Sequence, residues 1–281
     1  MSVGISTAFI KQFESDVHMA YQRMGSKLKD TIRQKPSVNG NQTVFQKVGK
    51  GSAVQKSRHG QVPIMNIDHS NVTVTLQDYF SADYVDRLDE LKTNIDERMV
   101  VAQSSAGALG RKTDELITTA LDGTSNLSGN SDSNGLTQAK IEAVFAQMGE
   151  NDIPDDGDRY FIVSPDGWVD LLQIAAFTDA DFIGPDELPF KGGMVAKRWL
   201  GFMWMIHSGL PATGGRRQCF AYHRTGLGVA MGADVTTEIN YIPERVSNLI
   251  TAYMSLGVVL IDDNAVFEAV SYTHLRAHET V

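Results

Sequence analysis

The chain has one cysteine, no long apolar run and no run of basic residues among its 281 residues. Its single cysteine, Cys219, excludes a disulfide within the chain and a zinc site made only of cysteines. No apolar run approaches the roughly 20 residues that span a bilayer. The start, MSVGISTAF, lacks the charged and apolar regions of a secretory signal. These absences predict a soluble protein of a reducing compartment, a class that fits many functions.

The chain also lacks a complete motif for catalysis or cofactor binding. Lys50-Gly51-Ser52 resembles the end of a phosphate-binding loop, but the first glycine of that motif would fall at 44–45 and is absent. The stretch GLGVAMG at 226–232 has the wrong spacing for dinucleotide binding. No GxSxG turn accompanies His207-Ser208. We therefore predict no catalytic residue, no cofactor and no metal ligand, and a protein that is not an enzyme.

Two polar stretches leave metal binding open as an alternative. The stretch NSDSNG at 130–135 resembles the start of a calcium loop, but the twelfth position of that loop is Ile141 rather than an acid. Four aspartates within 152–158 form a second cluster, which is more typical of a solvated turn. A metal-dependent enzyme or a calcium-binding module built on residues 130–158 is therefore an alternative hypothesis.

The negative net charge of −9 hides an uneven distribution along the chain. Residues 1–60 hold ten Lys and Arg and three Asp and Glu, a net charge of +7. The remaining residues hold 15 Lys and Arg and 31 Asp and Glu, a net charge of −16. A basic first fifth can contact nucleic acid, a membrane surface or the acidic body of a neighbouring copy, or it can simply be solvated. The basic residues are spread out, which disfavours a dedicated nucleic-acid arm.

The first part of the chain predicts three elongated elements. Apolar residues at helical spacing predict an amphipathic helix over 5–33. Residues 43–78 contain short β-type runs around VFQKV, VPIMNI and VTVTL, separated by glycines and without a core pattern. They predict a two-stranded arm that is marginal alone and needs a neighbouring surface. A single apolar stripe over 84–121 predicts a long helix with a kink or break at Gly107 and Gly110.

The second part of the chain predicts a mixed α/β region. Residues 122–135 are a loop by composition, and 137–149 form a helix. A buried strand at 159–163 leads to Ser164-Pro165, an N-cap followed by proline that opens a helix. Strands are predicted at 195–207 and 219–232, and a hairpin around 262–264 joins the last two strands.

The last twelve residues, VSYTHLRAHETV, are interpreted as foreign to the protein. This string resembles the conceptual translation of a transposase sequencing-library adapter. We therefore predict that the native sequence is lost from about residue 270 onward, and residues 270–281 are left out of the fold prediction. His274 and His278, at a spacing that would suit a metal site on a helix, are excluded with them.

The order of these elements resembles the major capsid (coat) proteins of tailed bacteriophages. The resemblance covers nearly the whole chain up to residue 269. It is strongest in FQKVGKGSAVQKSRHGQVPIMNIDHSNVTVTLQDY (45–79), YVDRLDELKTNIDERMVVAQSSAGALGRKTDELI (84–117) and ITAYMSLGVVLIDDNAVFEA (250–269). It implies an α+β fold with an N-terminal arm, an extended β-hairpin loop, a long spine helix in a discontinuous peripheral domain, and an α/β axial domain.

The resemblance also implies a domain division and a set of partners. The expected divisions are an N-terminal helical arm (1–40), an extended β-loop (41–80), a peripheral domain with the spine helix (81–129), an axial domain (130–235) and returning peripheral strands (236–269). The implied function is a structural subunit that self-assembles into hexamers and pentamers of an icosahedral head. This head encloses double-stranded DNA without sequence-specific binding.

A separate scaffolding protein and a portal are implied partners, and no membrane is involved. Assembly in the host bacterial cytoplasm and location in the virion capsid follow from the same resemblance. The runner-up is an encapsulin-like shell around cargo enzymes.

Charge complementarity between the arm and the long helix suggests which residues meet between subunits. Opposite charges on two surfaces steer association into register. The expected contact residues are basic on the arm and acidic at the start of the predicted long helix: Lys47, Lys50, Lys56, Arg58, Asp86, Asp89 and Glu90.

Overall fold

The computed structural model describes residues 25–87, 97–127, 135–178, 197–213 and 216–272. The chain forms two compact units. Unit 1 comprises Met1–Ser26, Asp78–Lys112 and Ala233–Ser255, and unit 2 comprises Lys27–Gln77, Thr113–Gly232 and Leu256–Val281. The expectations for residues 1–24, for the acids Asp89 and Glu90, and for 273–281 lie outside the described residues.

A four-stranded sheet with the order β1-β10-β11-β4 supplies the strands of unit 1. Its members are β1 (Arg33–Lys35), β10 (Leu227–Ile242), β11 (Ser247–Leu260) and β4 (Gln77–Asp86). The turn from β10 to β11 passes through η3 (Pro243–Arg245) and closes at Val246, whose φ of 51° is left-handed. The long strands β10 and β11 each have residues in both units, and β1 belongs to unit 2.

The long helix α2 (Glu97–Asp122) corrects the prediction for residues 84–121 at two points. Residues 84–86 lie in β4, and the helix runs through Gly107 and Gly110 without a break. A Cβ on Gly110 would clash with the backbone of Gly25. This glycine therefore permits a close backbone approach rather than ending the helix.

Unit 2 is built around a six-stranded sheet with the order β12-β9-β5-β7-β6, on which β8 pairs with β9. β5 and β7 are parallel, whereas β9 runs antiparallel to both β5 and β12. The strands are β5 (Arg159–Val163), β6 (Lys197–Trp199), β7 (Phe202–Ile206), β8 (Ala212–Thr213), β9 (Arg216–His223) and β12 (Val266–Tyr272). The helices are α3 (Gln138–Glu150), α4 (Pro165–Leu172) and α5 (Ala175–Thr178).

Stacked aromatic rings form the centre of the unit 2 core. Phe161 on β5 and Trp204 on β7 are both fully buried, and their ring centroids lie 4.2 Å apart at 12°. Phe202 meets Phe161 edge to face at 5.6 Å, and Phe177 of α5 meets Trp168 of α4 in the same way at 5.5 Å. Each such ring buries a large apolar area, and the stacked and edge-to-face pairs add stabilisation beyond that area.

Several predicted elements of unit 2 are confirmed. The strand over 159–163 and the helix that follows Thr137 are present. Ser164 caps α4, because its side-chain oxygen accepts the Gly167 N–H at 3.0 Å, and Pro165 follows at the first helical position. The predicted helix then divides into α4 and α5.

We expect Ser164→Ala to lower the free energy of unfolding by about 1 kcal/mol, because the Gly167 N–H loses its acceptor. Chemical denaturation measures this change. Ser208→Ala, a serine on an exposed turn, is the matched control. An unchanged unfolding midpoint for Ser164→Ala would show that the cap contributes nothing.

Two strand predictions near the end of the chain are wrong. The single strand over 195–207 is a hairpin, because Leu200 and Gly201 adopt positive φ values of 50° and 74° and turn the chain between β6 and β7. The predicted terminal hairpin is absent from the described residues, since β11 and β12 belong to different sheets. β12 pairs instead with β9, where Phe267 and Ala269 are buried.

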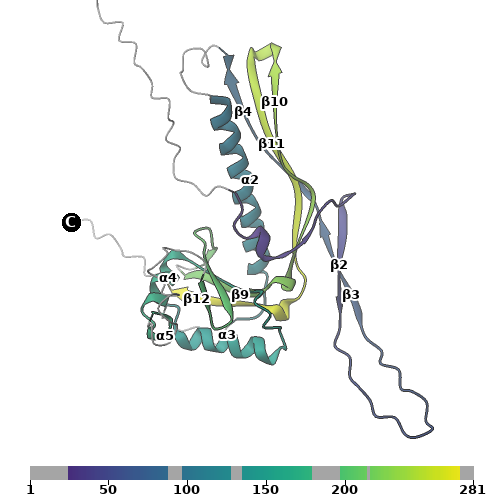
Figure 1. The fold of residues 1–281 in the computed structure, drawn as a ribbon. Helices are drawn as coiled ribbons and strands as arrows, with labels where there is room; N and C mark the ends of the chain where they lie inside the picture. Colours follow the sequence, from purple (N-terminus) through teal and green to yellow (C-terminus); the bar gives the residue numbers. More distant parts are fainter. Residues whose placement is uncertain (1–24, 88–96, 128–134, 179–196, 214–215, 273–281) are drawn as a thin grey trace, which may run out of the picture. The chain divides into compact units, whose positions relative to one another are not determined.

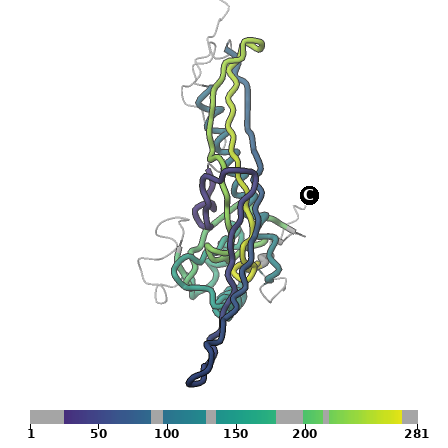
Figure 2. Tube along the Cα trace, turned by 90° about the vertical axis from the view of Figure 1, so that its right-hand side faces the viewer, coloured from purple at the N-terminus to yellow at the C-terminus, as the bar shows by residue number. Residues whose placement is uncertain are grey.

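The arm is confirmed as a two-stranded ribbon, although it is shorter than predicted. β2 (Gln42–Val48) pairs antiparallel with β3 (His69–Thr75), and both views show the strands side by side (Figures 1 and 2). The run VPIMNI is not a strand. The prediction that this region has no core is also wrong at its base. Phe45 and Val74 are 2% and 3% exposed, packed with Ala230 and Ile261.

The helix predicted over 5–33 does not reach its expected end. Only the short η1 (Lys29–Thr31) is helical in the described part of that range, and β1 follows at once. β1 pairs in parallel with β10, Arg33 opposite Gly228. Leu28, the member of the predicted apolar stripe that lies within the described residues, is fully buried, as is Ile32.

Candidate inter-subunit contact surface

The base of the arm is joined to the rest of unit 2 by two lysines. Lys47 Nζ lies 2.7 Å from Asp262 Oδ1, with both side chains about one-third exposed. Lys50 Nζ lies 2.6 Å from Asp152 Oδ2 and contacts the Asn151 carbonyl at 3.2 Å. The hydrogen bond and the charge of Lys50 lower the pKa of Asp152 below its usual value. Both predicted contact lysines therefore already have an acidic partner within their own chain.

The tip of the arm presents two cations and an apolar surface to solvent. Lys56 and Arg58 are exposed, and the carbonyl of Ser57 accepts the N–H groups of His59 and Gly60 in the tip turn, both at 3.1 Å. Exposed apolar side chains lie in the segments on both sides of this turn: Val54 at 64%, Val62 at 74%, Ile64 at 91% and Met65 at 49%. We call this set, with Lys56 and Arg58, the arm tip.

The predicted acidic partner residues belong to unit 1. Asp86 ends β4 and is exposed, while Asp89 and Glu90 lie outside the described residues. β4 also carries two exposed aromatic side chains, Phe80 at 69% and Tyr84 at 44%. The guanidinium of Arg245 lies 4.5 Å from the centroid of Tyr84, a cation–π arrangement. Asp86 therefore belongs to unit 1, whereas the predicted basic residues of the arm belong to unit 2.

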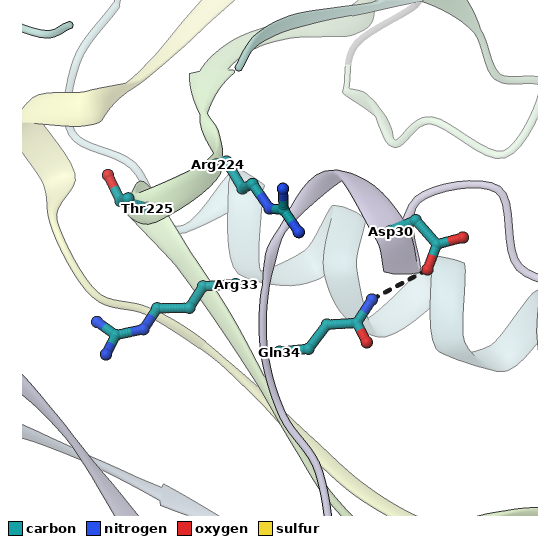
Figure 3. Close-up of a pocket in the computed structure, with 5 residues that line it drawn as sticks. All are labelled: Asp30, Arg33, Gln34, Arg224 and Thr225. Carbon is teal, nitrogen blue, oxygen red and sulfur yellow. Dashed lines mark hydrogen bonds between the residues drawn. The ribbon is translucent and has the colours of Figure 1, made fainter. Parts of the chain in front are cut away.

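A pocket of about 470 Å³ opens beside β1 in unit 2 and is lined by Asp30, Arg33, Gln34, Arg224 and Thr225. Gln34 Nε2 donates to Asp30 Oδ1 at 3.0 Å and to the Lys29 carbonyl at 2.9 Å. Figure 3 shows the guanidinium groups of Arg33 and Arg224 extending in different directions. Because the two cations do not converge, the pocket lacks the geometry of an anion-binding site.

A buried acid–histidine pair holds the start of unit 2, and sequence reasoning missed it. Asp114 on α2 and His207 after β7 are 0% and 1% exposed, with Oδ2 and Nε2 3.1 Å apart. The same carboxylate accepts the backbone N–H groups of Lys27 at 3.1 Å and Leu28 at 3.2 Å. His207 Nδ1 accepts the Gly209 N–H, so Nε2 carries the proton that faces Asp114.

The geometry of His207 removes the hydrolase interpretation of His207-Ser208. Both ring nitrogens are engaged, one with Asp114 and one with the Gly209 backbone.

The described residues contain no group of three or more His, Cys, Asp or Glu side chains that could hold a metal ion. Among the helices in the described ranges, none is long and apolar enough to cross a membrane.

The comparisons with known proteins identify the family. A family model described as phage capsid protein matches residues 5–271. The chain belongs to this phage capsid protein family. The solved capsid structure of cyanophage P-SCSP1u is similar to this phage capsid protein, with a TM-score of 0.75 and 17% identity, over 98% of this chain and 96% of that one.

Other phage structures share the fold. Mycobacterium phage Che8 matches with a TM-score of 0.72 and 17% identity, covering 93% of this capsid protein and 97% of that chain. The capsid of Ralstonia phage GP4 matches with a TM-score of 0.71 and 13% identity, over 98% of both chains. No curated protein matches the sequence. These likenesses confirm the predicted fold of tailed-phage capsid proteins.

Proposed function

We propose that this capsid protein self-assembles into the hexamers and pentamers of an icosahedral phage head that encloses double-stranded DNA. The family match over residues 5–271 supports the structural role. The arm is the observation that carries the proposal of assembly. Its tip exposes four large apolar side chains that the described part of the chain leaves uncovered. Such a ribbon is stabilised only when another surface covers it.

The proposed partner of the arm tip is a second copy of the chain. Lys56 and Arg58 are cations on the arm tip, whereas Lys47 and Lys50 pair within their own chain. We therefore assign inter-subunit attraction mainly to Lys56 and Arg58, with Asp86, Asp89 and Glu90 of the neighbouring copy as the acidic side. Scaffolding protein and portal are further proposed partners, with assembly in the host cytoplasm and final location in the virion.

Assembly is tested by producing the full chain with and without the scaffolding protein of the same genome. Negative-stain electron microscopy is expected to reveal closed shells, and nuclease protection tests whether filled particles hold DNA. A chain that stays monomeric even with scaffolding protein would contradict the proposal.

The charge assignment predicts that Lys56→Glu with Arg58→Glu reduces shell yield strongly, because two attractions become repulsions. Arg198→Glu, an exposed cation of unit 2 outside the arm, is the control and is expected to assemble normally. Equal yields of shells from both variants, measured by sedimentation, would remove Lys56 and Arg58 from the contact.

A further inference from the structure

Two carboxylates and one amide meet where α2 ends against the sheet of unit 2. Gln218 Nε2 donates to Oδ1 of Asp122, the last residue of α2, at 2.7 Å. Glu268 on β12 pairs with Phe220 of β9, two residues from Gln218. Because side chains alternate along strands and paired residues share a face, Gln218 and Glu268 lie on the same face of the sheet. We call these three residues the acid–amide cluster.

The cluster contains an unsatisfied acceptor. Gln218 and Glu268 are only 8% and 7% exposed. The side-chain oxygen Oε1 of Gln218 is buried and has no hydrogen-bond donor among the described residues. A buried carbonyl oxygen without a donor destabilises the fold, because the loss of its hydration is not offset by a hydrogen bond. An ionised Glu268 cannot supply a donor, whereas a protonated carboxyl group carries one O–H.

The surroundings of Glu268 offer little positive charge. The last turn of α2 has no basic residue. The helix α3 also packs against β12 and contributes one buried cation, Lys140. The Nζ group of Lys140 donates to the Gly135 carbonyl at 3.1 Å. Cys219, next to Gln218 on β9, is neutral because burial raises its pKa to about 12. A second negative charge beside Asp122 is therefore poorly compensated.

We propose that Glu268 takes up a proton more readily than an exposed glutamate does and donates it to Gln218 Oε1, which tightens the junction of α2 with β9 and β12. The carboxylate gains one proton from solvent and becomes a carboxyl group. A continuous chain of hydrogen bonds then runs from the Glu268 O–H to Gln218 Oε1 and from Gln218 Nε2 to Asp122. The junction is a pH-sensitive device built into unit 2.

The direction of the Glu268 pKa agrees with this geometry. Burial raises its pKa above the usual value, more than the hydrogen bond from Gln218 lowers it, and the charge of Asp122 raises it further. A folded chain whose carboxyl group has a raised pKa binds the proton more tightly than the unfolded chain. Its contribution to stability is therefore present at low pH and is lost as the pH rises through the folded pKa.

The same junction also holds the segment that follows α2. The backbone N–H of Glu268 donates to the Asn126 carbonyl at 2.9 Å, and Leu127 bridges to Glu268 in parallel. Thr124 Oγ1 donates to Asp263 Oδ1 at 2.7 Å, which fixes the other end of the segment. Protonation of Glu268 is therefore expected to slow amide exchange of residues 122–127.

The test compares unfolding of the full, unassembled chain with that of Glu268→Gln between pH 5 and 8. Gln mimics the protonated carboxyl group, so the variant is expected to gain stability relative to the wild type as pH rises. Between the unfolded and the folded pKa of Glu268, the ratio of the two unfolding constants is expected to change about tenfold for each pH step of one. Glu150→Gln, an exposed glutamate of α3, is the control and is expected to give no such gain. A ratio for Glu268→Gln that is independent of pH would overturn the proposal.

A direct titration keeps the proposal testable if the variant folds poorly. Carboxyl carbon NMR of the wild type is expected to reveal a glutamate that titrates above the others. Asp122→Asn is expected to lower this pKa, because it removes the neighbouring negative charge. A Glu268 resonance that titrates with the other glutamates would refute the device, whatever the outcome of shell assembly.

Discussion

Deleting residues 50–67 and joining Gly49 to Asp68 is expected to abolish shell formation while leaving the body of the chain folded. The deletion removes the arm tip, including Val62 and Ile64, which are 74% and 91% exposed and contribute nothing to a core within the chain. It retains β2 and β3, whose Phe45 and Val74 are buried. The join is geometrically short, because Gly49 N already donates to the Asp68 carbonyl at 2.8 Å.

Two measurements separate loss of assembly from loss of folding. The unfolding midpoint of the deletion variant is expected to match that of the full chain, and sedimentation is expected to give no shells even with scaffolding protein. A variant that replaces the exposed apolar residues of the tip with serine keeps the length of the arm and is the matched control for the apolar contact. Normal shells from the deletion variant would refute the assembly role of the arm.

The second large effect is expected from Asp114→Ala. The carboxylate is fully buried and accepts hydrogen bonds from His207 and from the backbone of Lys27 and Leu28. Removing one partner of a buried polar pair typically costs about 3–5 kcal/mol, because the remaining groups stay desolvated without an acceptor. Urea denaturation of the unassembled chain measures the loss.

The residues that lose protection distinguish a local role of the Asp114 hydrogen bonds from a general weakening of the core. Hydrogen exchange is expected to rise first at residues 27–32, which Asp114 ties to the rest of unit 2. Thr31, whose hydroxyl hydrogen-bonds the buried Tyr222, reports on the same segment. Glu150→Ala, at the exposed end of α3, is expected to change neither quantity. Protection of 27–32 that survives in Asp114→Ala would mean that packing of Leu28 and Ile32 alone holds the segment.

Local signals in the sequence determined the elements whose stabilising contacts are close in sequence. The N-cap at Ser164 is such a case, because the acceptor and the Gly167 N–H are three residues apart. The buried strand over 159–163 and the helix after Thr137 follow from apolar spacing alone. The arm was also predictable, since the β-branched and aromatic residues of its short runs favour extended strands.

Only the tertiary structure decided the pairings between distant segments. β12 pairs with β9 rather than with β11, because the core buries Phe267 and Ala269 there, and no local pattern records that choice. The glycines of α2 were predicted to kink or break the helix. In the structure the helix continues through them, and Gly110 permits the close approach of Gly25.

The predicted contact residues also show what the sequence could and could not predict. Charge counting along the chain predicted Lys47, Lys50, Lys56 and Arg58 together as basic contact residues, and the structure leaves Lys56 and Arg58 exposed. It could not anticipate that Lys47 and Lys50 meet Asp262 and Asp152, which are 215 and 102 residues away. The sequence by itself determined an elongated, basic arm on an acidic body. The fold decided which of those charges are already paired and which are left for a neighbour, because pairing depends on distance in space.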